Sequence, residues 1–356
     1  MTKTVATFTY AVRFHTPAFL GDAEQSGRWR TPPFKALIRQ WWRVAYAADR
    51  GFCVDVDEMR RAEGAVFGAA ADKSGNRSRV RIRLDRWTPG GMTQWQGDPG
   101  VFHKEVGKEI GAHLYLGFGP LTNKGQETFL GRKVDGSLKP HAAIQAGERA
   151  ELRLAFPEAD PTLLVRALHL IDRYGALGGR SRNGWGSLSL SPVDGEEDGK
   201  SDHPLPLRPW REALSLDWPH AIGKDGRGPL IWQTDPFDDW TALMHRLAEI
   251  KIGFRTQFAF PNSKPPHHDI EDRHWLAYPV TRHATRVWKR DARLPNSLRF
   301  KVRPDGAPTK LRGVIYHVPC RPPEGFTPDS PAIEDVWQRV HAFLDEPAQN
   351  LKRIPE

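Results

Sequence analysis

The chain has 356 residues, of which 39% are apolar and 27% are charged, so its composition is that of a folded globular protein and excludes a disordered one. Its 52 lysines and arginines exceed its 43 acidic residues and give a formal net charge of +9, which favours an anionic partner such as nucleic acid over a cation. Two cysteines, Cys53 and Cys320, rule out a disulfide framework and a CxxC site and favour a reducing cytoplasm, and no segment approaches the ~18 apolar residues that span a membrane.

The first part of the chain alternates strand and helix patterns. Period-two alternation predicts strands, and apolar residues at three- and four-residue spacing predict helices. Residues 88–146 are rich in glycine and are interpreted as an insertion, in which residues 112–119 could form a further strand. Around this insertion, we expect strands at 4–14, 77–87, 148–156 and 185–191, a helix from Pro33, and a second helix that Asp160 opens, with Pro161 just inside it, and that ends at Gly175. This order is the split βαβ arrangement of a ferredoxin-like fold.

A Pro- and Gly-rich acidic stretch, residues 193–209, has no periodicity and predicts a linker. After it, helix patterns are found at 238–254 and 331–346, and strand patterns at 297–304 and 311–319. We therefore expect an α+β protein with two domains, at residues 1–192 and 210–356, the second again ferredoxin-like (RRM-like).

The predicted helix after Pro33 carries two tryptophans. Trp41 shares a face with Phe34, Leu37 and Ile38, so it is assigned mainly to the core, although it stays in the candidate RNA-binding set. Trp42 is displaced toward a basic face, and its indole is predicted to be exposed and to stack on a base. The candidate RNA-binding residues of this helix are Lys35, Arg39, Trp41, Trp42, Arg43 and Tyr46.

A glycine-rich stretch, "GALGGRSRNGWGSL" at 175–188, begins where the helix pattern that follows Asp160 ends, and precedes a strand pattern. Close glycines allow backbone N–H groups to converge on an anion, and arginine adds bidentate phosphate contacts. Walker A loops and dinucleotide fingerprints follow a strand and open a helix, so neither ATP nor NAD is favoured. The alternative is a helix cap and a tight turn, in which glycine serves conformation alone. The candidate RNA-binding residues here are Gly178, Gly179, Arg180, Ser181, Arg182 and Asn183.

The element "GGRSRNGWGS" between the last helix and the last strand of a ferredoxin-like domain resembles the signature loop of the RAMP superfamily of CRISPR-associated RNA-binding proteins. The stretches "FHTPAFLGD", "RTPPFKALIRQWWR" and "AEGAVFGAA" are similar to the pattern of the first Cmr subunit of type III-B effector complexes. The resemblance covers roughly residues 8–190 and is thin beyond them. It implies two ferredoxin-like domains without a catalytic centre or cofactor. The partners that it implies are CRISPR RNA, target RNA and other Cmr/RAMP subunits, in cytoplasmic antiviral defence.

The alternative function is that of a metal-independent CRISPR RNA endoribonuclease. His15 and Asp22 lie where related nucleases of the superfamily place catalytic groups, but a lone histidine without a paired base is more often a packing residue. "HHDIEDRH" at 267–274 is the best metal candidate, yet its spacing fits no common zinc pattern, and a solvated loop is the favoured interpretation. The sequence therefore predicts neither a catalytic nor a metal-binding residue.

Overall fold

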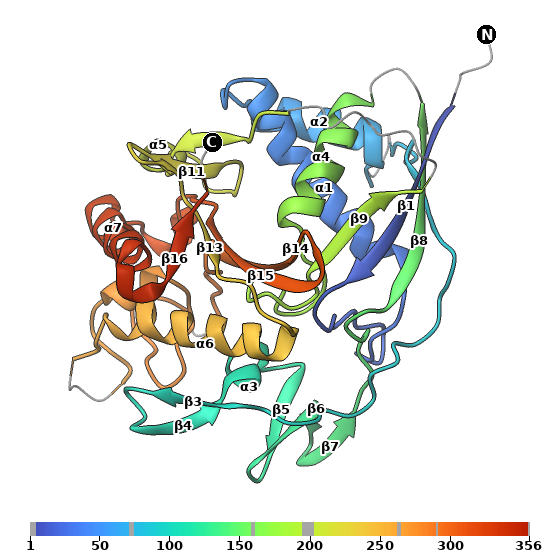
Figure 1. Cartoon of the computed structure of the whole chain (residues 1–356). Coiled ribbons are helices and arrows are strands. Elements are labelled where there is room, and N and C mark those ends of the chain that lie inside the picture. Colours follow the sequence, from blue (N-terminus) through green and yellow to red (C-terminus); the bar gives the residue numbers. More distant parts are fainter. Residues whose placement is uncertain are drawn as a thin grey trace.

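The computed structural model describes residues 5–70, 75–157, 161–193, 203–261, 265–289 and 291–354. Two four-stranded antiparallel sheets, with strand orders β2-β8-β1-β9 and β14-β15-β13-β16, organise these residues (Figure 1). Both sheets are built by the same βαββαβ connectivity, the element order of a ferredoxin-like unit, and the mixed helix and sheet content confirms the predicted α+β class.

The first sheet consists of β1 (Val5–Phe14), β2 (Arg81–Leu84), β8 (Arg149–Pro157) and β9 (Leu188–Pro192). Its strands alternate inward apolar and outward polar residues, so one face is buried against helices α1 (Thr31–Asp49) and α4 (Thr162–Tyr174). The apolar stripes of both helices, which include Leu37, Trp41, Leu168 and Ile171, complete this core.

The second sheet consists of β13 (Ile231–Thr234), β14 (Leu298–Asp305), β15 (Ala307–His317) and β16 (Leu351–Arg353). Helices α6 (Trp240–Thr256) and α7 (Ser330–Asp345) pack on one face of it, since Ile315 of β15 shares a core with Leu247 and Val340. Val314 and Tyr316 point the other way, into the core of the first half. The two sheets and their helices therefore form one stack, in which both faces of the second sheet are covered.

Hydrogen bonds fasten the two halves to each other. The buried ammonium of Lys301 donates to the carbonyl oxygens of Ile171 and Asp172 at the end of α4, at 2.8 and 2.5 Å. The Tyr316 hydroxyl donates to the carbonyl of Tyr174 at 2.6 Å. A cation near the C-terminal carbonyls of a helix also complements the helix dipole.

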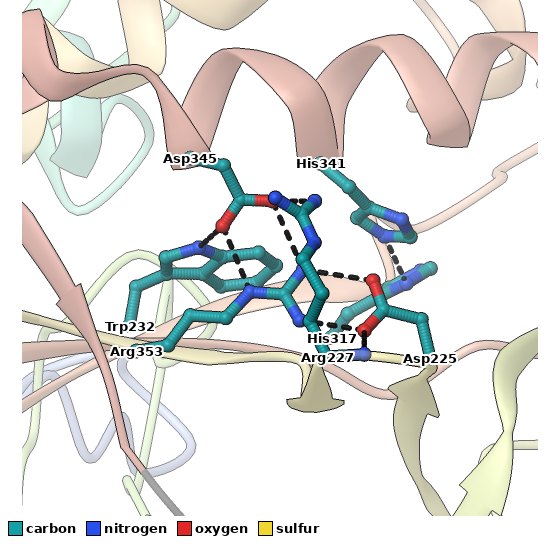
Figure 2. Close-up of polar contacts among 7 residues, drawn as sticks. All are labelled: Asp225, Arg227, Trp232, His317, His341, Asp345 and Arg353. Carbon is teal, nitrogen blue, oxygen red and sulfur yellow. Dashed lines mark hydrogen bonds and ion pairs between the residues drawn. The ribbon is translucent and has the colours of Figure 1, made fainter.

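Figure 2 shows how the C-terminal strand is held. Arg353 of β16 forms bidentate ion pairs with Asp225 and with Asp345 of α7, at 2.6 to 3.0 Å, and Asp345 also accepts from the Trp232 indole N–H at 2.9 Å. Because hydrogen-bonded charge pairs of this kind are strong and directional, they fix the last strand to the helix that precedes it.

The inserted region differs from the prediction. Residues 112–119 were predicted as a possible strand, which is wrong, because Ala112–Gly117 form helix α3, and Ala112 and Leu116, four residues apart, are both buried. Helix α2 (Val56–Phe67) was not predicted; Asp55 caps its N-terminus by accepting from the N–H groups of Asp57 and Glu58.

The remaining elements are short. The insertion adds β3 (Gly100–His103), β4 (Lys108–Gly111), β5 (Leu121–Lys124), β6 (Glu127–Val134) and β7 (Ser137–Pro140). The connection to the second sheet adds β10 (Leu207–Pro209), α5 (Trp210–Ala213), β11 (Ile222–Asp225) and β12 (Gly228–Pro229). Short 3-10 turns lie at Asp272–Trp275, Glu324–Phe326 and Pro347–Gln349. Residues 194–202 of the predicted linker lie outside the described residues, and 207–209 form a strand. In the part of the chain that the structure describes, no helix has the length and apolar character to cross a membrane.

Candidate nucleic-acid interface

A groove of about 1130 Å³ lies where the two halves meet, and we call it the central groove. Helix α1, the glycine-rich loop, the insertion helix α3, the end of α6 and β15 all contribute to its lining. It exceeds the roughly 300–1,000 Å³ typical of small-molecule pockets. The lining includes six cationic residues, Arg180, Arg182, Lys251, Arg255, Arg293 and Arg299, and no aspartate or glutamate among the described residues.

The glycine-rich loop forms one wall of the central groove. Gly178 and Gly186 have φ values of 99° and 65°, and a Cβ on them would lie 2.7 and 1.8 Å from the carbonyl oxygens of Phe19 and Leu177. These two glycines therefore serve the conformation of the turn, as the alternative interpretation proposed. The arginines between them point out of that turn and line the groove.

Backbone donors remain available at the tip of this loop. The N–H groups of Gly179, Asn183, Gly184 and Gly186 donate to carbonyls of the protein. Within the described chain, no hydrogen bond is made by the N–H groups of Arg180, Ser181 and Arg182. Three successive unpaired N–H groups next to two guanidinium groups form a site that an anion such as phosphate would satisfy.

Helix α6 supplies two cations to the opposite wall. The Lys251 ammonium donates to Oδ1 of Asn183 at 2.7 Å and lies 5.8 Å from the centre of the Tyr115 ring. Burial, together with Arg255 and Arg180, holds the pKa of the Lys251 ammonium well below its ordinary value. Because no carboxylate in the described lining of the groove balances the charge of Lys251, a bound phosphate would restore that charge.

Aromatic side chains make up the apolar part of the groove. Trp41 packs against Tyr174 and Tyr316, with ring centroids 6.1 and 6.5 Å apart, and is 2% exposed. Phe118, which directly follows α3, also lines the groove and is 60% exposed. The ring of Phe118 is therefore free to stack on a base.

The prediction that Trp42 is exposed is wrong. Trp42 is 3% exposed and packs against Tyr46 and Phe67, with centroid separations of 5.1 and 6.0 Å. Helix α2, which was not expected, covers this face of α1 and buries the indole.

The basic face of α1 is also occupied. Arg39 and Arg43 both pair with the buried carboxylate of Glu63 on α2, at 2.7 and 2.9 Å. Tyr46 is buried at 1% exposure, and Lys35, Arg39, Trp42, Arg43 and Tyr46 are absent from the described groove lining. The groove thus brings together Trp41 and five of the six predicted loop residues, Gly178 and Arg180 to Asn183, whereas the predicted basic face of α1 lies elsewhere.

The residues considered for catalysis have structural partners. His15 is 7% exposed, with Nε2 at 3.0 Å from the Ser189 hydroxyl, and burial together with Lys301 lowers its pKa to about 3. The Asp22 carboxylate accepts from the N–H groups of Glu24 and Ser26 and so caps its own turn.

The histidine-rich stretch at 267–274 is less solvated than expected. His267 and His274 are 1% and 0% exposed, and Nδ1 of His274 accepts from the N–H of Glu271 at 3.0 Å. Asp272 pairs with Arg339 at 2.9 Å. Among the described residues, no group of three or more His, Cys, Asp or Glu side chains is arranged to hold a metal ion.

Several groove residues were missed from the sequence. They include Phe118 in the insertion and Lys251, Arg255, Arg293 and Arg299 in the second half. Lys251 and Arg255 are four residues apart on one helix, so their spacing predicts that they share a face. No local sequence pattern indicates that this face borders the glycine-rich loop.

The sequence and the fold were compared with known proteins. The family model of the RAMP superfamily matches residues 12–189, half of the chain. No curated protein matches the sequence significantly. Among solved structures, apo Cmr1 from Pyrococcus furiosus is similar at a TM-score of 0.47 and 15% identity, over 98% of this chain and 98% of that chain. A chain of the type III-B Cmr-beta complex bound to cognate target RNA is similar at a TM-score of 0.47 and 10% identity, over 94% of this chain and 99% of that chain.

Proposed function

The chain belongs to the RAMP superfamily, and from that premise we propose that it is a non-catalytic RNA-binding subunit of a type III-B CRISPR effector complex. Its partners in this proposal are CRISPR RNA, target RNA and neighbouring RAMP subunits. The assignment to type III-B comes from the three sequence elements of the N-terminal half, "FHTPAFLGD", "RTPPFKALIRQWWR" and "AEGAVFGAA".

The observation that carries the RNA-binding proposal is the composition of the central groove. Six cations without an acidic residue among the described lining favour a polyanion, and the unpaired N–H groups of Arg180, Ser181 and Arg182 add donors for its phosphates. Phe118 and Tyr115 offer ring faces in the same groove.

The aromatic residues favour a single strand. In an A-form duplex the base faces are stacked inside, so side-chain rings in a groove have bases to contact only when the strand is unpaired. We therefore propose that phosphates bind along the glycine-rich loop and α6, and that a base of the strand stacks on Phe118.

The experiment that tests this proposal titrates the purified protein with labelled single-stranded and duplex RNA of the same sequence. Retarded, intact single-stranded RNA with weaker binding of the duplex is the expected result. Site-specific cleavage that is lost in His15→Ala would instead support the endoribonuclease alternative. Absence of RNA binding at low salt, for the protein alone and with its partner subunits, would contradict both functions.

Membership of a complex is tested separately. The protein is purified from its own cells under mild conditions, and the co-purifying proteins and RNA are identified. RAMP subunits and a short RNA of uniform length are expected, and a protein recovered without either would contradict the assignment to an effector complex.

A further inference from the structure

The first sheet has one face that no helix of the described chain covers, and we call it the open face. Helices α1 and α4 cover the opposite face, whereas the second sheet is covered on both sides (Figure 1). The side chains of the open face alternate with the buried ones along β1, β2, β8 and β9. They are Val5, Thr7, Thr9, Ala11 and Arg13 of β1, Arg81 and Arg83 of β2, Arg149, Glu151, Arg153 and Ala155 of β8, and Ser189 and Ser191 of β9.

Arginines face each other directly across the strands of the open face. Arg13 of β1 is opposite Arg149 of β8, and Arg83 of β2 is opposite Arg153 of β8. Directly opposed residues have Cβ atoms only ~4.5–5.5 Å apart, and like charges in these positions repel. An anionic group between the two guanidiniums of a pair would therefore relieve the repulsion between them.

These charges are largely uncompensated. Arg153 pairs with Glu151, but within the described residues Arg13, Arg81, Arg83 and Arg149 have no acidic side chain within 4.0 Å. By contrast, Arg39, Arg43, Arg273, Arg312, Arg339 and Arg353 elsewhere in the molecule are ion-paired. The open face thus presents four guanidiniums without an acidic partner, on a surface whose uncharged side chains are alanine, serine and threonine, with Val5 at its edge.

We propose that the open face docks a neighbouring protein subunit through carboxylates that the neighbour presents to the two arginine pairs. This proposal rests on the proposed function, because it takes the chain to be part of a multisubunit complex. The small side chains of Thr7, Ala11 and Ser191 allow a partner surface to approach the sheet closely, and arginine is a favoured residue of such interfaces.

A protein occupant fits better than RNA for two reasons. Glu151 lies in the middle of the face and Asp85 directly follows β2, so a phosphate backbone, which is charged at every nucleotide, would meet these carboxylates, whereas a protein can present its carboxylates to the two arginine pairs alone. The strands also place no aromatic side chain on this face for a base to stack on. The groove lies beyond the sheet and the helices α1 and α4, so a neighbour on the open face leaves the RNA route clear.

The first test introduces a photo-crosslinking residue at Ala11, between the arginine pairs, and at Arg60 on the exposed surface of α2 as a control. The complex is reconstituted with its partner subunits and RNA, irradiated and digested. A crosslink from position 11 to an Asp- or Glu-rich peptide of another subunit is expected, with none from position 60. A crosslink from position 11 to RNA, or to no partner, would overturn the proposal.

The second test compares Arg13→Glu/Arg149→Glu with Arg60→Glu/Arg61→Glu, which makes the same charge change on exposed residues of α2. Because like charges across an interface repel strongly, the first variant should join the complex at least ~100-fold more weakly, and the control should join as the wild type does. Both variants should bind single-stranded RNA within about twofold of each other, because neither alters the groove.

The outcomes separate the two proposals. Wild-type assembly of the Arg13→Glu/Arg149→Glu variant would overturn the docking proposal and leave the proposed function standing. Loss of RNA affinity in that variant alone would assign the open face to RNA and would also overturn docking. A wild-type chain that joins no complex would refute both proposals.

Discussion

Replacing both Arg180 and Arg182 with alanine removes two of the six cations that line the central groove. Neither guanidinium makes an ion pair within the described chain, and both residues are exposed, so the fold should remain intact. The carbonyl of residue 182, which accepts from the N–H of Phe300 at 3.0 Å, is kept in the variant. The perturbation therefore acts on the charge of the groove and leaves its position unchanged.

The expected magnitude follows from counterion release. For a single strand, the logarithm of the binding constant falls by about 0.7 per neutralised phosphate for each tenfold increase in salt. If each of the six cations neutralises one phosphate, the slope is about −4, and binding falls about 300-fold between 50 and 200 mM salt. With four cations left, the slope is about −3, and the fall over the same range is about 50-fold.

Fluorescence anisotropy of a labelled single-stranded RNA, titrated at several salt concentrations, measures this slope. Arg60→Ala/Arg61→Ala removes two exposed cations from α2, outside the groove lining, and serves as the matched control. The control should keep the wild-type slope. An unchanged slope in Arg180→Ala/Arg182→Ala, or an equal change in the control, would refute the assignment of phosphates to the glycine-rich loop.

Four further variants test other parts of the structure. Phe118→Ala should weaken RNA binding by ~1–3 kcal/mol without lowering Tm, because the ring is 60% exposed. Trp42→Ala should instead lower the free energy of unfolding by ~3–5 kcal/mol, because the indole is buried. The reverse pattern in melting and binding assays would contradict the geometry. Phosphate binding should raise the lowered pKa of Lys251, so RNA affinity should fall as pH rises toward the ordinary lysine pKa of about 10.4, and less so in Lys251→Arg; equal pH profiles would count against a role of Lys251. Burial lowers the pKa of His341 to about 3, so the unfolded chain alone binds this proton below about pH 6.5, and stability should fall by about 1.4 kcal/mol per pH unit as pH falls toward 3. Urea unfolding at several pH values measures how the free energy of unfolding depends on pH. This dependence should be weaker by that amount in His341→Gln than in the wild type, and an identical dependence would show that His341 does not titrate as described.

Much of the fold followed from local patterns. The alternation in residues 4–14 and the helical spacing after Asp160 predicted β1 and α4, because each element buries one continuous face against its own half. Helix α3 was mistaken for a strand because only six residues of it exist, too few for a helical period to appear.

The candidate site was predicted in part. The glycine-rich loop stood out by composition, and Trp41, Gly178 and Arg180 to Asn183 do line one groove. Trp42 and the arginines of α1 were assigned to a surface because their helical face is polar. A polar face can also pack against a second helix when that helix carries an acid that pairs with the arginines. Glu63 of α2 is that acid, 20 residues after Arg43.

The sequence by itself determined the α+β class, the strand and helix order of the first half, the basic character of the chain and the glycine-rich loop. These properties depend on composition and on contacts between near neighbours in the chain. Only the tertiary structure decided which cations share a groove and which are neutralised. Lys251 lies 68 residues from its partner Asn183, and Glu63 neutralises Arg39 and Arg43 by pairing with both guanidinium groups. Whether a charged side chain is available to a ligand depends on which groups pack against it. Segments that are distant in the sequence supply those groups, and local patterns do not encode which distant segments meet.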